Sequence, residues 1–444
     1  MFKPKCCLRY LHRLQGFAED FKLVRSCSSV SRAKLQWSYN HGPSDVPLRG
    51  ITIGKQLQNQ VELNPDKEAL VFCKTGIRRT FSQLLDEIDS LAAGLLALGL
   101  KRGDRVGIWG PNSLQWILTQ YATARAGLIL VNINPAYLPN ELEYVLSKVN
   151  CSAIIADEVF KDQNYYEMLF QLLPELASSK PGELHSHLLP SLKNIIMMGD
   201  NGYPGTYKFS DVMNAGSDKD KRKIVDLQTR LQFDDPINIQ FTSGTTGFAK
   251  GATLTHHNIL NNSYFTGRRL DYHNRETRIC MPVPLYHCFG MVIGSLMMPT
   301  YGSCVVFPSP GFDAKATLKA ADKERCTSMY GVPTMFIDML NHHDFPQFDL
   351  SSLYTGVMAG SPCPIETMQQ VINKMNMHEV TVCYGTTETS PVTYQSFMDD
   401  DIKKRVSTIG QPLDHVEAKV VDENGDIVAV GTQESFVPVV SPQC

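Results

Sequence analysis

The clearest amphipathic pattern in the chain follows Thr80, where the sequence reads TFSQLLDEIDSLAAGLLALGL. Apolar side chains recur there at helical spacing, at Leu84, Ile88, Leu91 and Leu95. Thr80 with Gln83 has the pattern of a capping box, and a glycine such as Gly99 commonly ends a helix. The spacing therefore predicts a helix that begins after Thr80 and ends near Gly99.

Short apolar runs alternate with helical stretches along much of the chain. Residues 105–109 read as a buried strand, and a helix at residues 141–146 is followed by a strand at residues 152–156. Further strand-like runs, each followed by a turn containing Gly, Pro or Thr, occupy residues 237–241, 303–307, 327–330, 354–358 and 380–383. Strands that alternate with helices predict an α/β fold, and turns at strand ends are where such sheets bind ligands.

Polar residues dominate residues 161–235, where the apolar strand candidate is residues 192–198. We interpret the charge run DKDKRK, residues 218–223, as a solvated loop. Near the C-terminal end, apolar residues stand at alternate positions, at Val416, Ala418 and Val420. The turn Asn424-Gly425 that follows them predicts a hairpin.

Composition narrows the class of protein. At 444 residues and 43% hydrophobic, the chain is long enough to bury a large core or several packed subdomains. A formal net charge of −3 offers no overall attraction for nucleic acid, which we exclude as a partner. No apolar run approaches the ~18 residues of a membrane-spanning helix, so no transmembrane segment is predicted. The 12 cysteines show no C-x-x-C pair, and we expect reduced, mostly core-packed thiols.

The first 45 residues differ in composition from the rest. They are rich in Arg, Lys and Ser, and carry few acidic residues. This composition is typical of a mitochondrial transit peptide, so residues 1–45 are predicted to direct the protein to the mitochondrial matrix. A basic tail without a targeting role is the alternative, and no long apolar run supports a secretory signal.

The most specific segment is FTSGTTGFAKG, residues 241–251, which follows an apolar strand. Its glycines expose backbone N–H groups, and together with the hydroxyls and one lysine they suit a triphosphate. A Walker A loop needs Gly before its lysine and Ser or Thr after it, whereas Lys250 stands between Ala249 and Gly251. The segment therefore differs from a Walker A motif at two positions. A flexible Ser/Thr/Gly turn is the other alternative.

The second candidate segment is CYGTTETS, at the end of the strand at residues 380–383. Tyr384 offers an aromatic face for a base, while Thr386 and Thr387 offer hydroxyls for a phosphate. Glu388 offers a carboxylate that could hold Mg²⁺ beside that phosphate. A Gly-Thr-Thr turn with a glutamate is common, so this segment indicates a nucleotide site only in combination with residues 241–251.

Together the two segments resemble the signature motifs of the adenylate-forming superfamily, which contains acyl-CoA synthetases, firefly luciferase and peptide-synthetase adenylation domains. Supporting motifs occur in the expected order: WGPNS (109–113), AGLILVNINPAY (126–137), PLYHCFG (284–290), YGVPTMF (330–336) and AGSP (359–362). The resemblance covers about residues 49–433 and is closest to a mitochondrial branch usually described as medium-chain ligases. It implies an α/β large domain at residues 46–433, with two stacked mixed sheets, flanking helices and a small β subdomain.

The resemblance also implies an activity and its cofactors. The protein would join a fatty acid to coenzyme A through an acyl-adenylate, using ATP and Mg²⁺. The residues that would bind ATP are Thr242, Ser243, Gly244, Thr245, Thr246, Gly247, Phe248, Ala249, Lys250, Gly360, Ser361, Tyr384, Gly385, Thr386 and Thr387. Lys250, Thr387 and Glu388 would be catalytic, with Glu388 also holding Mg²⁺. His287 would gate the acyl tunnel, with a hydrogen-bonded core histidine as the alternative.

Two departures from the family pattern concern the loop and the C-terminal end. Ala249 replaces a usual proline, which leaves the lysine in place. After Gln433 the family continues with a T-G-D aspartate and a lid domain that carries a catalytic lysine, whereas this chain ends in ESFVPVVSPQC. We therefore expect a divergent tail at residues 434–444 and no lid. A truncated nucleotide-binding form with little or no turnover is the alternative function.

Overall fold

The structure, a computed structural model, describes residues 35–242, 248–433 and 435–439. Contacts divide the chain into two compact units. Asn40–Ala418 forms the body of the larger unit, and the smaller unit contains Lys419–Val437 together with residues up to Tyr39. The described candidate site residues all belong to the larger unit.

The first large sheet contains the strand that leads into the predicted phosphate loop. In the described part of the chain it has seven strands, in the order β10 (Tyr207–Lys208), β9 (Asn194–Met197), β6 (Ala153–Ala156), β4 (Arg105–Trp109), β5 (Ile129–Ile133), β11 (Pro236–Thr242) and β12 (Lys250–Thr255). All neighbours are parallel except β11 and β12, which are antiparallel. The parallel strands of this sheet therefore direct their carboxyl ends to one edge.

The second large sheet contains the strand that precedes the second motif. Among the described residues it has nine strands, in the order β19 (Gln411–Pro412), β18 (Val392–Gln395), β17 (Glu379–Gly385), β16 (Thr355–Ala359), β15 (Ser328–Gly331), β13 (Arg278–Cys280), β14 (Cys304–Phe307), β2 (Glu68–Phe72) and β3 (Ile77–Thr80). Its middle strands are parallel and its outer pairs antiparallel. Both sheets are mixed, as the resemblance implies.

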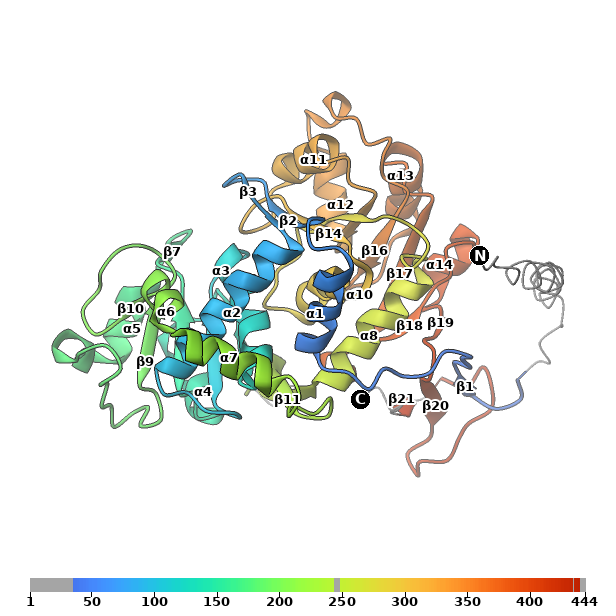
Figure 1. Ribbon diagram of the computed structural model, residues 1–444. Coiled ribbons are helices and arrows are strands. Elements are labelled where there is room, and N and C mark those ends of the chain that lie inside the picture. The colour runs from blue at the N-terminus through green and yellow to red at the C-terminus, as the bar shows by residue number, and fades with distance from the viewer. Residues whose placement is uncertain (1–34, 243–247, 434, 440–444) are drawn as a thin grey trace, which may run out of the picture. The chain divides into compact units, whose positions relative to one another are not determined.

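Helices cover the faces of both sheets (Figure 1). The α-helices are α1 (Ile53–Leu63), α2 (Phe81–Ala97), α3 (Leu114–Ala126), α4 (Pro139–Lys148), α5 (Tyr165–Leu172), α6 (Phe209–Ala215), α7 (Asp218–Leu227), α8 (His256–Arg269), α9 (Cys288–Gly290), α10 (Met297–Tyr301), α11 (Ala314–Lys323), α12 (Pro333–Leu340), α13 (Ile365–Lys374) and α14 (Ile402–Ser407). The π-helix η4 (Met291–Ser295) joins α9 to α10, and short 3₁₀ helices are η3 (Pro174–Ser178), η5 (Phe345–Gln347) and η6 (Thr387–Thr389).

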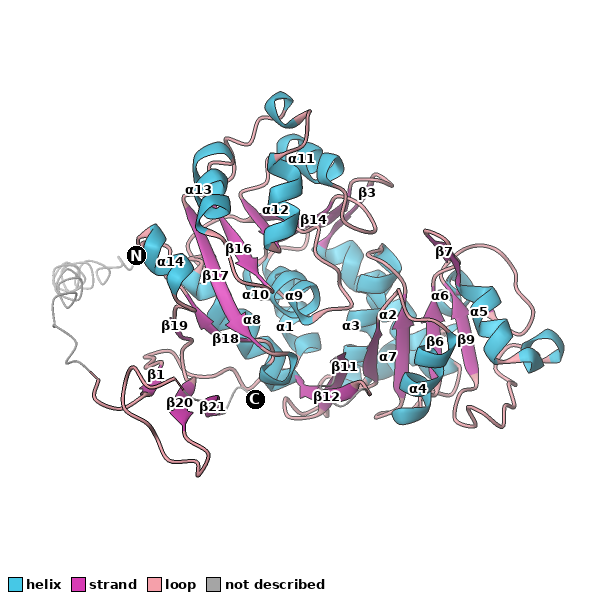
Figure 2. Ribbon diagram, turned by 180° about the vertical axis from the view of Figure 1, so that it is seen from behind, coloured by secondary structure: helices cyan, strands magenta, loops and turns pink. Residues whose placement is uncertain are grey.

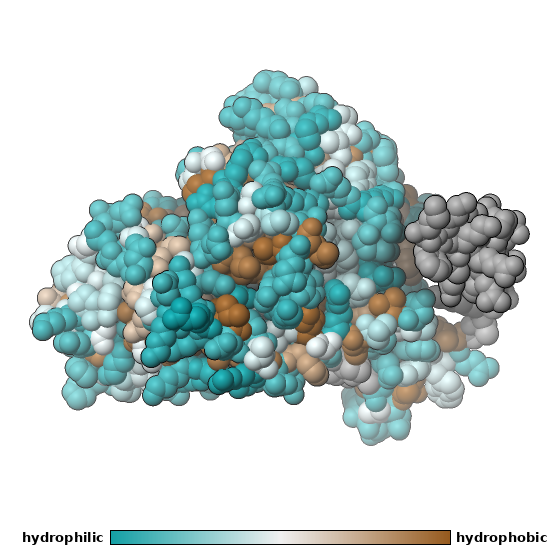
Figure 3. Space-filling view, viewed as in Figure 1, coloured by the Kyte–Doolittle hydropathy of each residue, from teal (hydrophilic) through white to brown (hydrophobic). Residues whose placement is uncertain are grey.

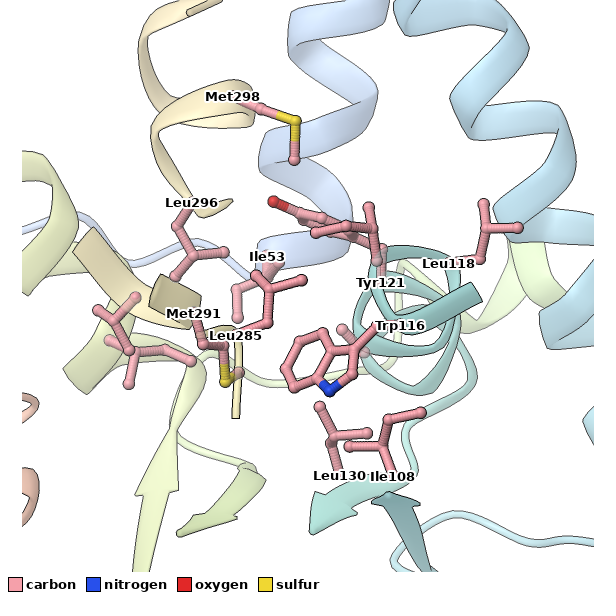
Figure 4. Packing of buried hydrophobic residues seen from close by; sticks show 14 of the residues in the cluster. Ile53, Ile108, Trp116, Leu118, Tyr121, Leu130, Leu285, Met291, Leu296 and Met298 are labelled. Atoms are coloured by element: carbon pink, nitrogen blue, oxygen red, sulfur yellow. The ribbon is translucent and has the colours of Figure 1, made fainter. Parts of the chain in front are cut away.

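Three clusters of buried apolar side chains fill the larger unit. The central cluster combines side chains of both sheets with those of α1, α2, α3, α8 and α10. Figure 2 shows α1, α3 and α10 between the two sets of strands, and Figure 4 shows Trp116 and Tyr121 of α3 packed in this cluster. The other two clusters lie on the outer faces, beneath α11 to α13 and beneath α4 and α5. The helices and sheets therefore alternate in layers, which confirms the α/β expectation.

The predicted elements with strong local patterns are confirmed. Helix α2 begins after Thr80, whose side chain accepts the Gln83 N–H while the Gln83 side chain accepts the Thr80 N–H. Its repeating leucines and Ile88 are buried. The strands predicted between residues 105 and 383 appear as β4, β6, β9, β11 and β14 to β17, shifted by at most two residues at each end.

The charge run at residues 218–223 is a helix, so the loop interpretation was wrong. The Ser217 side chain caps α7, and Asp220 completes a capping box with it. Acidic residues in the first turn favour the positive end of the helix dipole, and Ile224 is buried against the core. Exposed charges on the outer face of a capped helix produce the same composition as a solvated loop.

The smaller unit contains the predicted hairpin turn. A small sheet has the order β1 (Tyr39–His41), β20 (Glu417–Val421) and β21 (Ser435–Val439). The chain reverses after β20 at Asn424-Gly425, where the Gly425 N–H donates to the Asp422 carbonyl at 3.1 Å. An antiparallel bridge joins Val421 and Ile427 across the turn. The turn is confirmed.

On the face shown in Figure 3 hydrophilic residues predominate, and apolar residues lie in patches among them. Scattered exposed apolar side chains are ordinary on globular proteins. Within the described residues, no helix combines the length and the apolar character needed to cross a bilayer.

Candidate functional site

The predicted phosphate loop connects the antiparallel strands β11 and β12. Thr242, the last residue of β11, is the cross-strand partner of Lys250, the first residue of β12. The loop residues between them, Ser243, Gly244, Thr245, Thr246 and Gly247, lie outside the described residues. Lys250 is exposed beside Thr242, so the hairpin holds the lysine at the base of the loop.

The returning end of this loop is anchored by α4. The Tyr144 hydroxyl donates to the carbonyl of Ala249 at 2.9 Å. The ring of Phe248 lies 5.4 Å from the Tyr144 ring, between centroids, and is 69% exposed. Tyr144 therefore contacts both Phe248 and Ala249.

The residues predicted to line the adenine follow neighbouring strands of the second sheet. Strands β16 and β17 are parallel, and Ala359 is the register partner of Cys383. Gly360 and Ser361 therefore lie beside Tyr384, and all three are exposed. Gly360 has φ +90°, a backbone conformation that glycine adopts without strain.

A hydrogen bond joins the two main motifs across 146 residues of sequence. The Thr242 hydroxyl donates to Glu388 Oε1 at 3.1 Å. Glu388 lies in η6, directly after the Gly385-Thr386 turn that ends β17. The end of β11 therefore lies against the turn that carries Thr387 and Glu388.

The PLYHCFG motif reaches the same place from a third segment. The sulfur of Cys288 lies 3.7 Å from the Thr387 hydroxyl, and burial raises the pKa of this thiol to about 11. His287 precedes it and caps α9, because its Nδ1 accepts the Phe289 N–H at 3.2 Å. This acceptor role leaves the proton of the neutral imidazole on Nε2. The structure thus brings Cys288, the residue after His287, into contact with Thr387.

The histidine alternatives can be compared directly. The His287 residue is exposed, while the protein atoms around its ring lower its pKa by disfavouring the charged form. His287 is therefore a partly solvated residue beside the site rather than a histidine enclosed in the core.

The site faces solvent in this structure. Lys250, Glu388 and Tyr384 are exposed, as are Gly385 and Thr386, and Thr387 is partly exposed. An exposed lysine and carboxylate keep their charges without a large desolvation cost. The arrangement suits a charged, water-soluble ligand.

Glu388 is the carboxylate among the predicted site residues. It is exposed and lies beside the Thr242 hydroxyl, so oxygen donors are present. Mg²⁺ usually takes one or two carboxylates together with phosphates and waters, which this donor set fits. The one described cluster of three His, Cys, Asp or Glu side chains within mutual reach of a metal ion is His342, His343 and Asp344, outside these motifs.

A cavity elsewhere on the larger unit lies outside the predicted site residues. It measures about 550 Å³ and is lined by Phe72, Phe160 and Phe307, by Lys74 and Lys161, and by Pro111, Asn112 and Ser113 of the WGPNS motif. None of its lining residues is a predicted site residue. The contacts between motifs locate the candidate site better than cavity size does, because an open, solvent-facing site encloses little volume.

Sequence reasoning gave no role to three polar residues beneath the site. Asn132, Asn238 and Gln240 are buried, and they make hydrogen bonds to one another. Their pattern was visible, because Asn238 and Gln240 alternate with apolar residues in the strand INIQF. Their partners could not be inferred without the register of the strands.

The candidate site lies at the carboxyl ends of strands from two sheets, where α/β proteins bind ligands. Residues 57–433 match the AMP-binding enzyme family, and the chain belongs to that family. Two solved structures share the fold. The anthranilate CoA ligase AuaEII in complex with anthranoyl-AMP has a TM-score of 0.74 at 23% identity, covering 89% of this chain and 71% of that one. A luciferase-like enzyme from Zophobas morio has a TM-score of 0.74 at 20% identity, covering 90% and 88%.

Curated relatives are more similar in sequence. The chain is 52% identical over 401 residues to "Medium-chain acyl-CoA ligase ACSF2, mitochondrial" of Danio rerio, which covers 90% of this chain and 66% of the relative. It is 46% identical to the Homo sapiens protein of the same name, covering 89% of this chain and 65% of the relative. The chain thus spans just under two thirds of the length of these relatives.

Proposed function

We propose that this chain carries the ATP- and acid-binding part of an ATP-dependent medium-chain fatty acid–CoA ligase. The observation that supports it most is the hydrogen bond from Thr242 to Glu388, because it joins the phosphate-loop hairpin to the turn with Thr387. The names of the relatives support the choice of a medium-chain acid.

The proposed reaction has two steps. A carboxylate oxygen of the acid attacks the α-phosphorus of ATP, the bond to the leaving pyrophosphate breaks, and an acyl-adenylate forms. The CoA thiolate then attacks the acyl carbon, AMP leaves, and a thioester forms. Activation is needed because a carboxylate oxygen is a poor leaving group.

The described residues would have separate roles in this reaction. Lys250 offsets the charge that develops on pyrophosphate, and the Thr387 hydroxyl donates to an α-phosphate oxygen. Tyr384 lies against the adenine, which Gly360 and Ser361 line from the neighbouring strand. His287 borders the path of the acyl chain.

The remaining described residues of the two motifs would lie beside the phosphates. Phe248 and Ala249 would border the β- and γ-phosphates, while Gly385 and Thr386 would shape the turn beside the nucleotide. When bound, Mg²⁺ held by Glu388 and the phosphates would neutralise phosphate charge.

Acid-dependent exchange of pyrophosphate into ATP tests this function. It is measured with octanoate in this chain and in the same chain extended by a family-type lid. Exchange that requires the acid supports the proposal. An extended protein that binds MgATP yet shows no exchange with any medium-chain acid would contradict it.

The relatives' names also support a mitochondrial location, and we propose the matrix. Residues 1–34 of the proposed transit peptide lie outside the described residues. A fluorescent protein fused to residues 1–45 should enter the matrix and resist added protease in isolated mitochondria. A diffuse cytosolic signal would argue against import.

A further inference from the structure

Three amide side chains lie on one face of the neighbouring strands β5 and β11. Asn132 and Gln240 are register partners in this parallel pair, and Asn238 precedes Gln240 by two residues. Side chains two residues apart on a strand share a face, so all three leave the sheet in the same direction. They are 3%, 0% and 3% exposed for Asn132, Asn238 and Gln240 respectively.

Their hydrogen bonds form a directed chain. Gln240 Nε2 donates to Asn238 Oδ1 at 2.8 Å, and Asn238 Nδ2 donates to Asn132 Oδ1 at 2.9 Å. Asn132 Nδ2 donates to the main-chain carbonyl of Tyr286 at 3.0 Å. Asn132 and Gln240 also direct their NH₂ groups at the sulfur of Met291, at 3.3 and 3.5 Å.

The final acceptor fixes the orientation of every amide. A main-chain carbonyl can only accept, so Asn132 must present its NH₂ group to Tyr286 and its oxygen to Asn238. A reversed Asn132 amide would place oxygen against oxygen in a buried environment, which is costly. The network therefore has one favourable arrangement, and it ends on the loop before α9.

The network holds one particular peptide unit. The carbonyl of Tyr286 accepts from Asn132, while the N–H of the same peptide unit, that of His287, donates to the Pro284 carbonyl at 3.3 Å. Both polar ends of this unit are paired, so its plane is fixed. That plane sets the direction in which the His287 side chain leaves the backbone.

The loop beyond this peptide borders the proposed reaction centre. The sulfur of Cys288 lies 3.7 Å from the Thr387 hydroxyl. Under the proposed function, the acid's carboxylate must approach the α-phosphate beside Thr387. Figure 4 shows Leu285 and Met291, on either side of this loop in sequence, packed into the central core. The loop is therefore anchored in the core on both sides, and its residue Cys288 contacts Thr387.

We propose that Asn132 is a positioning residue for the acid substrate, acting through the Tyr286 carbonyl on the Tyr286–His287 wall. This inference rests on the proposed function and assigns Asn132 no contact with the substrate. It follows that loss of the Asn132 amide should weaken binding of the acyl part much more than binding of the nucleotide.

A matched control is available because a second asparagine is equally buried elsewhere. Asn261 of α8 is 0% exposed, donates to the carbonyls of Arg49 and His257, and accepts the Arg49 N–H. Replacing either asparagine by Ala deletes the same group from a buried network. A purely structural role would make the two variants alike.

The experiment compares two ligands in the full chain. Octanoyl-sulfamoyladenosine, a stable mimic of the acyl-adenylate, and ATP are titrated calorimetrically into the unchanged protein, N132A and N261A. For N132A we expect the mimic to bind about 10-fold more weakly, which corresponds to the loss of one buried hydrogen bond. The affinity of N132A for ATP should stay within twofold of that of the unchanged protein. For N261A both affinities should stay within twofold. N132L, which restores volume without a donor, should show the same split if N132A folds poorly.

Amide hydrogen exchange gives a second readout that does not involve ligands. The segment 286–290 should exchange faster in N132A than in N261A. Equal loss of affinity for both ligands in N132A, or no loss, would overturn the inference while leaving the proposed function intact. Failure of the unchanged protein to bind the mimic would overturn the proposed function itself.

Discussion

The hydrogen bond between Thr242 and Glu388 can be tested by a double-mutant cycle. Thr242→Val removes the hydroxyl but keeps the branched shape, and Glu388→Ala removes the acceptor. The donor and acceptor lie 3.1 Å apart and join the ends of strands from different sheets. If this contact organises the ATP site, the two substitutions should not act independently.

The expected coupling energy between Thr242 and Glu388 depends on how far the two side chains are exposed to solvent. A hydrogen bond to a charged group contributes about 1.5–3 kcal/mol when it is shielded from water. Glu388 is exposed and Thr242 partly exposed, so water competes and we expect about 1 kcal/mol, or about a 5-fold change in the Kd for MgATP. Glu388→Ala should weaken MgATP binding more, because we propose that this carboxylate also binds Mg²⁺.

The assay is MgATP binding by calorimetry in the four proteins of the cycle. In the Glu388→Ala background, adding Thr242→Val should weaken MgATP binding by less than a further twofold. Thr253→Val, at an exposed position of β12, is the control and should leave the affinity unchanged. A full 5-fold loss from Thr242→Val in the Glu388→Ala background would refute the reasoning.

Two further predictions concern Lys250 and His256. Lys250→Ala should lower the rate of acid-dependent pyrophosphate exchange about 100-fold in the lid-extended protein. Lys403→Ala on α14 is the control and should leave this rate unchanged. Equal rates in the two variants would show that Lys250 has no role in the mechanism. Burial lowers the pKa of His256 to about 4 in the folded protein, whereas an unfolded histidine has a pKa of about 6.5. Between these two pH values the imidazole is therefore protonated in the unfolded chain but not in the folded protein. The free energy of unfolding should therefore fall by up to about 3 kcal/mol as the pH drops through that window, and His256→Asn, compared by urea unfolding, should lack this component.

Local patterns were sufficient for most of the scaffold. Helix α2 could be placed because its cap and its apolar positions lie within one short segment. The strand β11 was recognisable because a run of apolar residues precedes a turn. The same reliance on local composition failed at α7, where Ser217 and Asp220 form a capping box and Ile224 is buried, so the charge run belongs to a helix.

The candidate site was predictable as a set of motifs but not as an arrangement. Lys250 and Glu388 were chosen from their own segments, yet the contact of Thr242 with Glu388 depends on how two sheets pack. The role of Asn132 depends on its register with Gln240, a long-range property of the pair β5 and β11. Such pairings are set by tertiary packing, so a single sequence does not specify them.

A crystal structure of this chain with octanoyl-sulfamoyladenosine tests the placement of nucleotide and acid. We predict the adenine against Tyr384, the sulfamate beside Thr387, and the acyl chain passing His287. A mimic bound instead in the cavity lined by Phe72 and Phe307, with the strand ends of β11 and β17 free of ligand, would contradict the proposed site.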